Sequence, residues 1–404
     1  MQFYIDIEDA AGVRYGPGPI VSAANWMSES NVDRAGRFSF AMPAADPKAL
    51  LVEKKRYASC YAILPGGVTK LGRGIIDRIA TEPGAGGEVK LTVGGDNLLR
   101  ELNWRSVELL GLFSGTSPIT HAAAVTALSA YLPAGWSAVA AAAPGNNDIY
   151  YTYAGESVLA AAIKLAELSR CHVWMSSERT LTFSNTWPSS GLRAIEAPFR
   201  PNLNDANTCF IDKFEKVEDT YDLITRVLPY GGEVIGGTAG QIVTLADCTK
   251  SAPVGYTLST GSKYIKRDAA EVTYGRIESF EKFSDIKANS TATADKQAAA
   301  NMLFDAGLRE IQQRSDPTQF FSLKLNHCAQ VVQPFRTIRA VFRMVANGRN
   351  VVNIDQVLYV MGSTIEVDAN EIRTTALDVA TVDRWADTNA SPIAELIINS
   401  LRIN

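Results

Sequence analysis

The start of the chain alternates apolar and polar residues. Phe3, Ile5 and Ile7 are separated by polar side chains, which is the period-two pattern of a strand with one buried face. Between residues 56 and 93 the segments RYASCYAIL, VTKLGRGIIDRIA and EVKLTV continue this character. A Pro-Gly-Gly turn and a glycine-rich loop separate them. The first hundred residues are therefore predicted to be mainly sheet.

Helical periodicity replaces this pattern after Trp104. Ser117 followed by Pro118 is a good N-cap and N1 pair, and it predicts a helix over ITHAAAVTALSAYL that ends before a proline. A second amphipathic helix, ESVLAAAIKLAELS, is predicted to begin after Gly155, with Glu156 in its first turn. It leads directly into the strand pair CHVWMS and RTLTFS. The pattern predicts a compact unit of one helix on one hairpin.

The second half of the chain returns to strands, with one long helix. Residues 207–286 contain DLITRVLPYGG, EVIGG, QIVTLAD and EVTYGRIESFEKF between Gly, Pro and Asp clusters, which predicts loop-rich sheet. A helix is predicted over 293–313. Asn347-Gly348 between two apolar runs predicts a hairpin with a type I′ turn. The preceding strand, 321–325, has the alternation needed to join that sheet.

Composition limits the kinds of partner the chain can have. A length of 404 residues predicts more than one domain. Hydrophobic residues make up 46% and charged residues 20%, as in ordinary globular proteins. The formal net charge of -4 gives no electrostatic reason to bind nucleic acid or an anionic membrane. The N-terminus has no signal-peptide pattern. The longest low-charge run, 129–149, is broken by prolines and glycines, so membrane insertion is not expected.

The sequence gives few candidates for chemistry. Five cysteines are widely spaced, which predicts reduced and mostly buried thiols. His121, His172 and His327 do not form a metal-binding motif, so no metal or cofactor is expected. Cys171-His172 and His327-Cys328 are adjacent pairs whose side chains would point to opposite faces of a strand. The glycine cluster 230–240 lacks Gly-Lys-Ser/Thr, and a turn-rich β loop is the better interpretation.

Two functional alternatives stay open at this point. The carboxylate pairs Glu278 with Glu281 and Asp212 with Glu215 would suit a cell-wall hydrolase of a tail if a cleft brought them together. The tryptophans would suit a β-rich glycan-binding adhesin if several of them lined one cleft. Ion pairing and core packing are the ordinary interpretations of these residues. The six tryptophans are Trp26, Trp104, Trp136, Trp174, Trp187 and Trp385.

The order of the segments resembles a known family. KLGRGIIDRI, EVKLTVGGDNLLRELNW, GESVLAAAIKLAELSRCHVWMSSERTLTF, RVLPYGG, YGRIESFEKF and the late hairpin together resemble the hub proteins at the tail tip or baseplate of long-tailed phages and Mu-like prophages. The resemblance implies an α+β, mainly β fold with two tail-tube-like β-barrel domains and an inserted helix-plus-hairpin subdomain. It also implies a structural, non-enzymatic virion protein that acts in host cell entry.

The same resemblance implies an assembly. Three chains would form a homotrimer that joins the sixfold tail tube, or a distal tail protein, to a threefold central spike or fibre. DNA would pass through the central channel without specific binding, in a tail tip assembled in the cytoplasm of the bacterial host. The expected divisions are 1–104, first tube-like β domain; 105–200, inserted α/β subdomain; 201–289, β-rich segment partly completing the first domain; 290–318, helix; 319–385, second tube-like β domain; and 386–404, C-terminal helical tail.

The C-terminal tail is the candidate partner interface. Ser391-Pro392 predicts the start of a final short helix. Two interpretations remain open for its apolar face: the helix folds back on its own domain, or it inserts into the spike or fibre. That face consists of Ile393, Leu396, Ile397 and Leu401.

Overall fold

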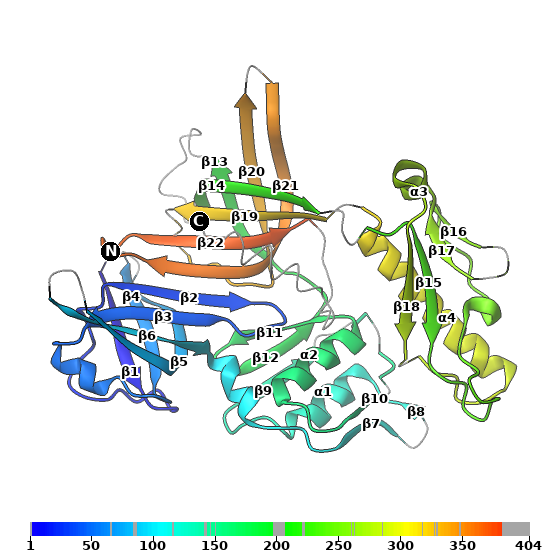
Figure 1. Ribbon diagram of the computed structural model, residues 1–404, viewed down its shortest axis with the longest axis horizontal. Coiled ribbons are helices and arrows are strands. Elements are labelled where there is room, and N and C mark those ends of the chain that lie inside the picture. Colours follow the sequence, from blue (N-terminus) through cyan, green and yellow to red (C-terminus); the bar gives the residue numbers. More distant parts are fainter. Residues whose placement is uncertain are drawn as a thin grey trace.

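The fold is taken from a computed structural model of the chain. The structure describes residues 2–381 except 65–66, 84–86, 115–116, 141–143, 146, 150, 197–206, 220–222, 260, 262, 285, 317, 327, 329 and 347–348. Four parts are visible in Figure 1: an N-terminal β unit, a subdomain with two helices, a β-barrel, and a module built on the longest helix. The mainly β fold predicted from the sequence is confirmed.

The N-terminal β unit is a six-stranded antiparallel arrangement in the order β1-β4-β5-β6-β3-β2. Its predicted strands are confirmed, and Phe3, Ile5 and Ile7 are buried. A short 3-10 helix, η1 (Pro47–Leu51), lies between β3 and β4. The strands are β1 (Gln2–Glu8), β2 (Asn25–Asn31), β3 (Arg37–Pro43), β4 (Tyr57–Leu64), β5 (Gly67–Pro83) and β6 (Val89–Asn97).

The inserted subdomain packs two helices against small sheets (Figure 1). The predicted hairpin is confirmed as β11 (His172–Ser177) and β12 (Thr180–Ser184), with Arg179 in the left-handed region at φ 58°. Buried residues of both helices and of the hairpin share one core. The remaining elements are η2 (Leu98–Trp104), β7 (Leu110–Ser114), β8 (Ser117–Pro118), α1 (His121–Ser129), β9 (Ser137–Ala140), β10 (Tyr151–Tyr153) and α2 (Val158–Ser169).

Both helix starts differ from the prediction. Ser117-Pro118 forms the short strand β8, and α1 begins after Thr120, whose hydroxyl accepts the Ala123 N–H. Ser157 is the N-cap of α2, while Glu156 precedes the helix and accepts the Ala154 N–H. In each case a Thr or Ser hydroxyl nearer to the apolar run satisfies a free N–H of the first turn. The local capping hydroxyl therefore sets each start.

The β-barrel closes through six strands in the order β21-β20-β13-β14-β19-β22, because β22 also pairs with β21. The predicted hairpin strands are confirmed as β20 and β21, and their far end projects from the barrel (Figure 1). The Asn347-Gly348 turn itself lies outside the described residues. The strands are β13 (Ser189–Glu196), β14 (Thr208–Asp219), β19 (Thr318–Asn326), β20 (Arg336–Ala346), β21 (Arg349–Val367) and β22 (Arg373–Ala380).

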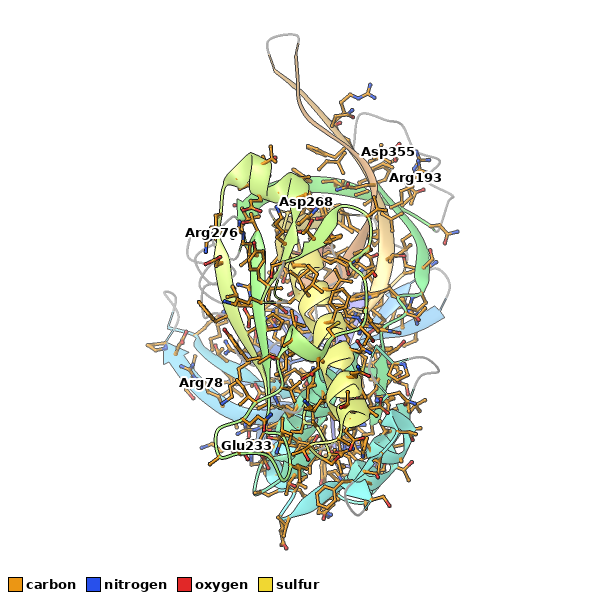
Figure 2. The ribbon with its side chains drawn as sticks, turned by 90° about the vertical axis from the view of Figure 1, so that its right-hand side faces the viewer. Arg78, Arg193, Glu233, Asp268, Arg276 and Asp355 are labelled. Carbon is orange, nitrogen blue, oxygen red and sulfur yellow. The ribbon has the colours of Figure 1, made fainter. Side chains whose placement is uncertain are left out.

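The fourth part, called the α4 module here, is inserted between β14 and β19. Its sheet has the order β16-β17-β15-β18, and α4 (Thr293–Arg314) packs against β15 and β17. Figure 2 views the module from outside, with Asp268 and Arg276 at one end and Glu233 at the other. Its other elements are β15 (Arg226–Gly231), η3 (Leu245–Asp247), β16 (Tyr256–Leu258), β17 (Ile265–Arg267), α3 (Asp268–Tyr274) and β18 (Glu278–Phe283).

The strand pairing of this region corrects one expectation. Residues 201–289 were expected to complete part of the N-terminal β unit, yet none of their described strands pairs with β1–β6. β14 belongs to the barrel, and β15–β18 form their own sheet with a separate apolar core under α4. Leu323 and Leu325 on β19 are fully buried and face the barrel core together with Ile211 of β14. Burial of that shared apolar face assigns β14 to the barrel.

Candidate functional site at the domain junctions

The first junction is a strand pair that joins the N-terminal β unit to the barrel. β2 pairs antiparallel with β21, from Trp26 opposite Val367 to Asn31 opposite Gly362. A Cβ atom on Gly362 would lie 2.6 Å from Asn31 Oδ1, so a larger residue at this position would displace the Asn31 side chain. The free edge of β2 thus pairs with a barrel strand and not with another strand of the N-terminal β unit. A continuous hydrogen-bonded sheet fixes the two β units in one orientation.

The second junction is an aromatic cluster where three parts of the chain meet. Phe335, at the entry to β20, stacks on Trp174 of β11 with ring centroids 3.7 Å apart, and on Trp187 at 4.2 Å. Val32, at the end of β2, completes this buried cluster. Phe335 has φ 58°, a left-handed conformation that is costly for a bulky residue. Stacking on both sides compensates for that cost and fixes the position of the barrel against the subdomain.

A buried imidazole lies beside this cluster. His172 Nδ1 is 2.6 Å from Asp33 Oδ2, and the Val173 N–H donates to Asp33 Oδ1 at 2.8 Å. The Asp33 N–H in turn donates to the Val173 carbonyl. Asp33 follows β2 and His172 opens β11, so these bonds connect the N-terminal β unit to the subdomain. The neighbouring residue, Cys171, belongs instead to the subdomain core. Cys171 and His172 are therefore adjacent in sequence but lie in two different environments.

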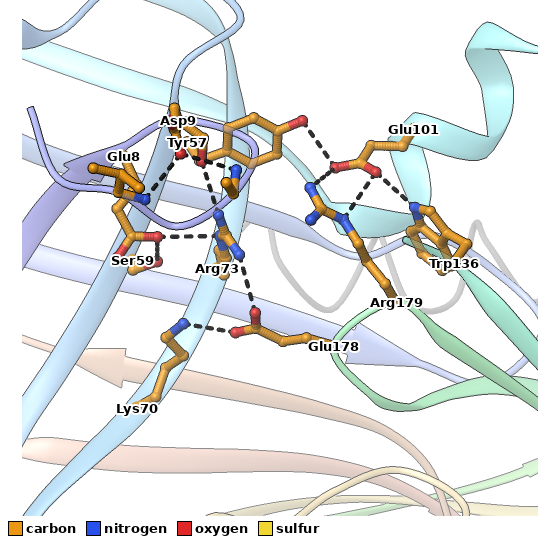
Figure 3. A network of polar contacts seen from close by, with 12 residues as sticks. Glu8, Asp9, Tyr57, Ser59, Lys70, Arg73, Glu101, Trp136, Glu178 and Arg179 are labelled. Atoms are coloured by element: carbon orange, nitrogen blue, oxygen red, sulfur yellow. Dashed lines mark hydrogen bonds and ion pairs between the residues drawn. The ribbon is translucent and has the colours of Figure 1, made fainter. Parts of the chain in front are cut away.

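The third junction is an ionic network (Figure 3). Glu178, in the turn of the β11–β12 hairpin, accepts from Lys70 Nζ at 2.6 Å and from Arg73 Nη1 at 3.0 Å. Arg73 Nη2 also donates to the Asp9 carbonyl, and its Nε is 3.3 Å from Glu8 Oε2. The side chains of Arg73 and Glu8 are only 6% and 5% exposed. Shielding from water strengthens such contacts, so the hairpin turn is held on β5.

Glu101 is the centre of the other half of the network (Figure 3). It accepts hydrogen bonds from Tyr57 Oη at 2.8 Å and from Trp136 Nε1 at 2.6 Å. Arg179 donates to it through Nε at 3.1 Å and Nη2 at 2.8 Å. Burial alone would raise the pKa of Glu101, but the hydrogen bonds from Arg179, Trp136 and Tyr57 lower it. Burial, followed by the bond to Glu101, raises the pKa of Tyr57 to about 12.

Two adjoining surface hollows lie beside this network, and Ala10, Tyr57 and Trp104 line both of them. The carboxylates available there are already engaged. Both Glu101 oxygens accept hydrogen bonds, and Asp9 Oδ1 accepts the N–H groups of a local turn. In these two hollows the lining carboxylates, Asp9 and Glu101, therefore already serve as acceptors in structural hydrogen bonds.

Of the two carboxylate pairs considered for hydrolysis, Glu278 and Glu281 lie in ion pairs. Glu278 contacts Arg226 and Arg276, and Glu281 accepts from Arg314 Nη1 at 2.7 Å. Asp212 and Glu215 lie on β14, where a register shift falls at Asp212. Within the described residues, no group of three or more His, Cys, Asp or Glu side chains could hold a metal ion. The glycine cluster is a turn-rich loop after β15, as predicted.

The tryptophans do not gather in one cleft among the described residues. Trp26, Trp136 and Trp174 are buried, whereas Trp104 is 47% exposed and lies under Lys55. Trp385 lies outside the described residues, as do His327 and the candidate interface residues Ile393, Leu396, Ile397 and Leu401. The junction residues Asp33, Glu101 and Arg179 were not predicted, because each takes its partners from distant segments. No helix in the described ranges is long and apolar enough to cross a membrane.

Comparison with known proteins identifies the fold. No protein-family model and no curated protein matches the chain. A tail protein from Neisseria meningitidis MC58 matches with TM-score 0.61 and 14% identity, over 96% of this chain and 98% of that one. The 43 kDa tail protein of prophage MuSo2 from Shewanella oneidensis matches with TM-score 0.60 and 9% identity, over 94% and 97%.

A third solved structure agrees with these two. The prophage tail protein gp18 from Listeria monocytogenes EGD-e matches with TM-score 0.60 and 11% identity, over 100% of this chain and 99% of that one. The chain therefore shares its fold with these three tail proteins. The resemblance predicted from the sequence is confirmed at the level of fold, along the whole length of the chain.

Proposed function

We propose that this chain is a structural hub at the tip of a phage tail. In this proposal three copies form a ring in which each chain contributes two β units, so that a sixfold tail tube meets a threefold central spike or fibre. The full-length similarity in fold to tail proteins supports this role. The protein would be part of the virion and would be assembled in the cytoplasm of the bacterial host.

The pairing of β2 with β21 is the observation that carries the proposal. It places two β units side by side in a single sheet, and the aromatic cluster and the ionic network add further contacts to the same orientation. A ring of paired units needs this fixed angle, because an error at each junction would prevent closure. One rim of the ring would bind the tail tube or a distal tail protein, and the other rim the spike or fibre.

The proposed role is geometric and not enzymatic. DNA would pass through the ring without specific binding, since the net charge of -4 provides no surplus of cations to neutralise phosphates. The engaged state of Glu101, Glu278 and Glu281 is consistent with structural carboxylates. Large permanent interfaces, on the order of 2,000 Å² or more, would hold the chains together.

Molar mass in solution together with negative-stain imaging tests this proposal. The expected result is three times the mass of one chain and a threefold ring with a central hole. A compact monomer at micromolar concentration would contradict it. Zymograms on cell-wall material serve as the parallel test of the hydrolase alternative, for which we expect no clearing.

The C-terminal tail is proposed to contact the spike or fibre. Deleting residues 390–404 should abolish spike attachment while leaving the ring intact. Leu396→Asp places a charge on the expected apolar face and should have the same effect. Asn399→Asp adds the same charge to another face and is the matched control. Normal spike attachment after the deletion would remove this part of the proposal.

A further inference from the structure

Two cysteines from distant parts of the chain meet at one end of the barrel. Cys209 is the second residue of β14, and Cys328 follows the end of β19. The two strands are antiparallel with Phe210 opposite Asn326, which brings the start of one beside the end of the other. The two side chains belong to the same apolar core, and the interaction with Cys209 is the first cause of the raised pKa of Cys328. Both residues are buried in the barrel core, at 0% and 4% exposure.

A cation lies next to this pair. Arg373, at the start of β22, interacts electrostatically with both thiols, and its Nη1 is buried without a hydrogen-bond acceptor. A buried N–H without an acceptor costs free energy, and an anionic sulfur beside it would reduce that cost. The interaction with Cys209 and burial nevertheless raise the pKa of Cys328. The thiol form therefore predominates at neutral pH, with the guanidinium favouring the reactive thiolate when it forms.

We propose that Cys209 and Cys328 are a dithiol pair that closes to an intrachain disulfide when the protein meets an oxidising low-molecular-weight disulfide. The thiolate of one cysteine attacks the external disulfide, forming a mixed disulfide and releasing one small thiol. The second cysteine then attacks the protein sulfur of that mixed disulfide and releases the other small thiol. The protein loses two hydrogens, and the external disulfide gains two electrons and two protons. The sulfur atoms have to approach to ~2.05 Å.

The position of the bond determines its effect. β14 leads into the α4 module and β19 returns from it, with Asp219 opposite Thr318 at the module end. The disulfide would join the opposite end of this two-stranded ribbon, so the ribbon could not separate from the end remote from the module. If the chain is a virion protein, as proposed above, its release from a reducing cytoplasm supplies the oxidising change. The chemistry of the pair does not depend on that role.

Oxidised glutathione is the probe for the test. Reduced full-length protein is incubated with it at pH 8, quenched with acid, denatured, and alkylated with iodoacetamide. The fully reduced chain should take up five alkyl groups, one for each cysteine. We expect two fewer after oxidation, and a tryptic peptide pair joined through Cys209 and Cys328. The melting temperature should rise by about 5 °C or more and return after reduction.

Two variants make the test specific. Cys328→Ser should abolish both the linked peptide and the rise in melting temperature. Cys248→Ser removes a half-buried thiol of the α4 module and should still lose two alkyl groups. The proposal is wrong if both cysteines stay alkylatable in the folded wild type while the same treatment links them in the urea-unfolded chain. If the protein is a monomer that still forms the Cys209–Cys328 disulfide, this inference is supported and the proposed hub function is contradicted.

Discussion

Buried charges at the domain junctions show how individual residues specify this fold. Glu101 receives donors from three segments, through Tyr57, Trp136 and Arg179. Nonpolar side chains of similar size would pack at these positions without such directional bonds. These hydrogen bonds to Glu101 form together only when three segments take one relative position. The segments are β4, the loop that follows α1, and the turn of the β11–β12 hairpin. At the scale of single residues, polar contacts therefore specify orientation, while the apolar cores supply most of the stability.

Glu101→Gln should destabilise the protein by about 2–4 kcal/mol. The substitution removes the charge opposite Arg179, and the new amide N–H₂ meets donors from Trp136 or Arg179. Urea unfolding at pH 7, followed by tryptophan fluorescence, measures the change. Asp355→Asn is the control, because Asp355 pairs with Arg339 on the exposed barrel surface and its loss should leave the unfolding midpoint unchanged. Equal midpoints for both variants would contradict a structural role for Glu101.

The same carboxylate predicts how stability depends on pH. The folded-state pKa of Glu101 lies below the ordinary 4.5. A lowered pKa adds stability above the unfolded value, and this stability is lost as pH falls through the folded value. The gap in unfolding free energy between wild type and Glu101→Gln should therefore be constant from about pH 7 to 5 and shrink below about pH 4.5. Unfolding curves at pH 7, 5.5 and 4 test this prediction. A difference in unfolding free energy that widens in acid would contradict a lowered pKa of Glu101 in the folded state.

At the scale of elements, two neighbouring glycines of β6 differ sharply in their surroundings. A Cβ atom on Gly95 would lie 1.9 Å from the Ile75 carbonyl oxygen and 3.0 Å from the Phe38 ring. On Gly94 the nearest atom would be 3.4 Å away, an ordinary contact. The β5 backbone therefore leaves no room for a side chain at Gly95. This close contact coincides with the register shift in β5 between Ile76 and Arg78.

Gly95→Ala should cost about 2 kcal/mol or more, because the strands must separate to admit the methyl group. Gly94→Ala introduces the same methyl group one residue earlier and should change stability by no more than about 0.5 kcal/mol. Thermal melts of the two variants, monitored by circular dichroism, give the comparison. Similar melting temperatures for both would show that the strands accommodate the methyl group at either position.

Elements with local signals could be predicted from the sequence, and those formed by distant pairing could not. The hairpin 172–184 and the helix from Thr293 have their periodicity and turn residues within one short window. The pairing of β2 with β21 leaves no such signal. The sequence of either strand predicts a strand, but it does not predict which distant strand pairs with it. Asp33 and Arg179 likewise resemble ordinary surface residues until the fold places their partners beside them. Sequence periodicity therefore recovered strands and helices, while the junctions depend on tertiary structure.

At the scale of the whole molecule, the α4 module is separable from the rest of the chain. Its apolar core under α4 is distinct from the barrel core. It leaves the barrel between two adjacent paired residues, Asp219 and Thr318. Arg309 Nη1 donates to the Gly145 carbonyl at 2.6 Å and connects the module to the inserted subdomain. A connection through one pair of strands and a separate apolar core are typical of an insertion that folds as a unit.

Replacing residues 220–317 with Asn-Gly should therefore leave a folded protein. The two residues form a type I′ turn, which would connect β14 to β19 as an ordinary hairpin with the register unchanged. We expect the shortened chain to melt within about 5 °C of the full chain and to keep its oligomeric state, because the β units would build the ring. Arg309→Ala in the full chain is the control for the lost contact to Gly145. If the shortened chain fails to fold while Arg309→Ala is stable, the barrel depends on the module, and the ring cannot be attributed to the β units alone.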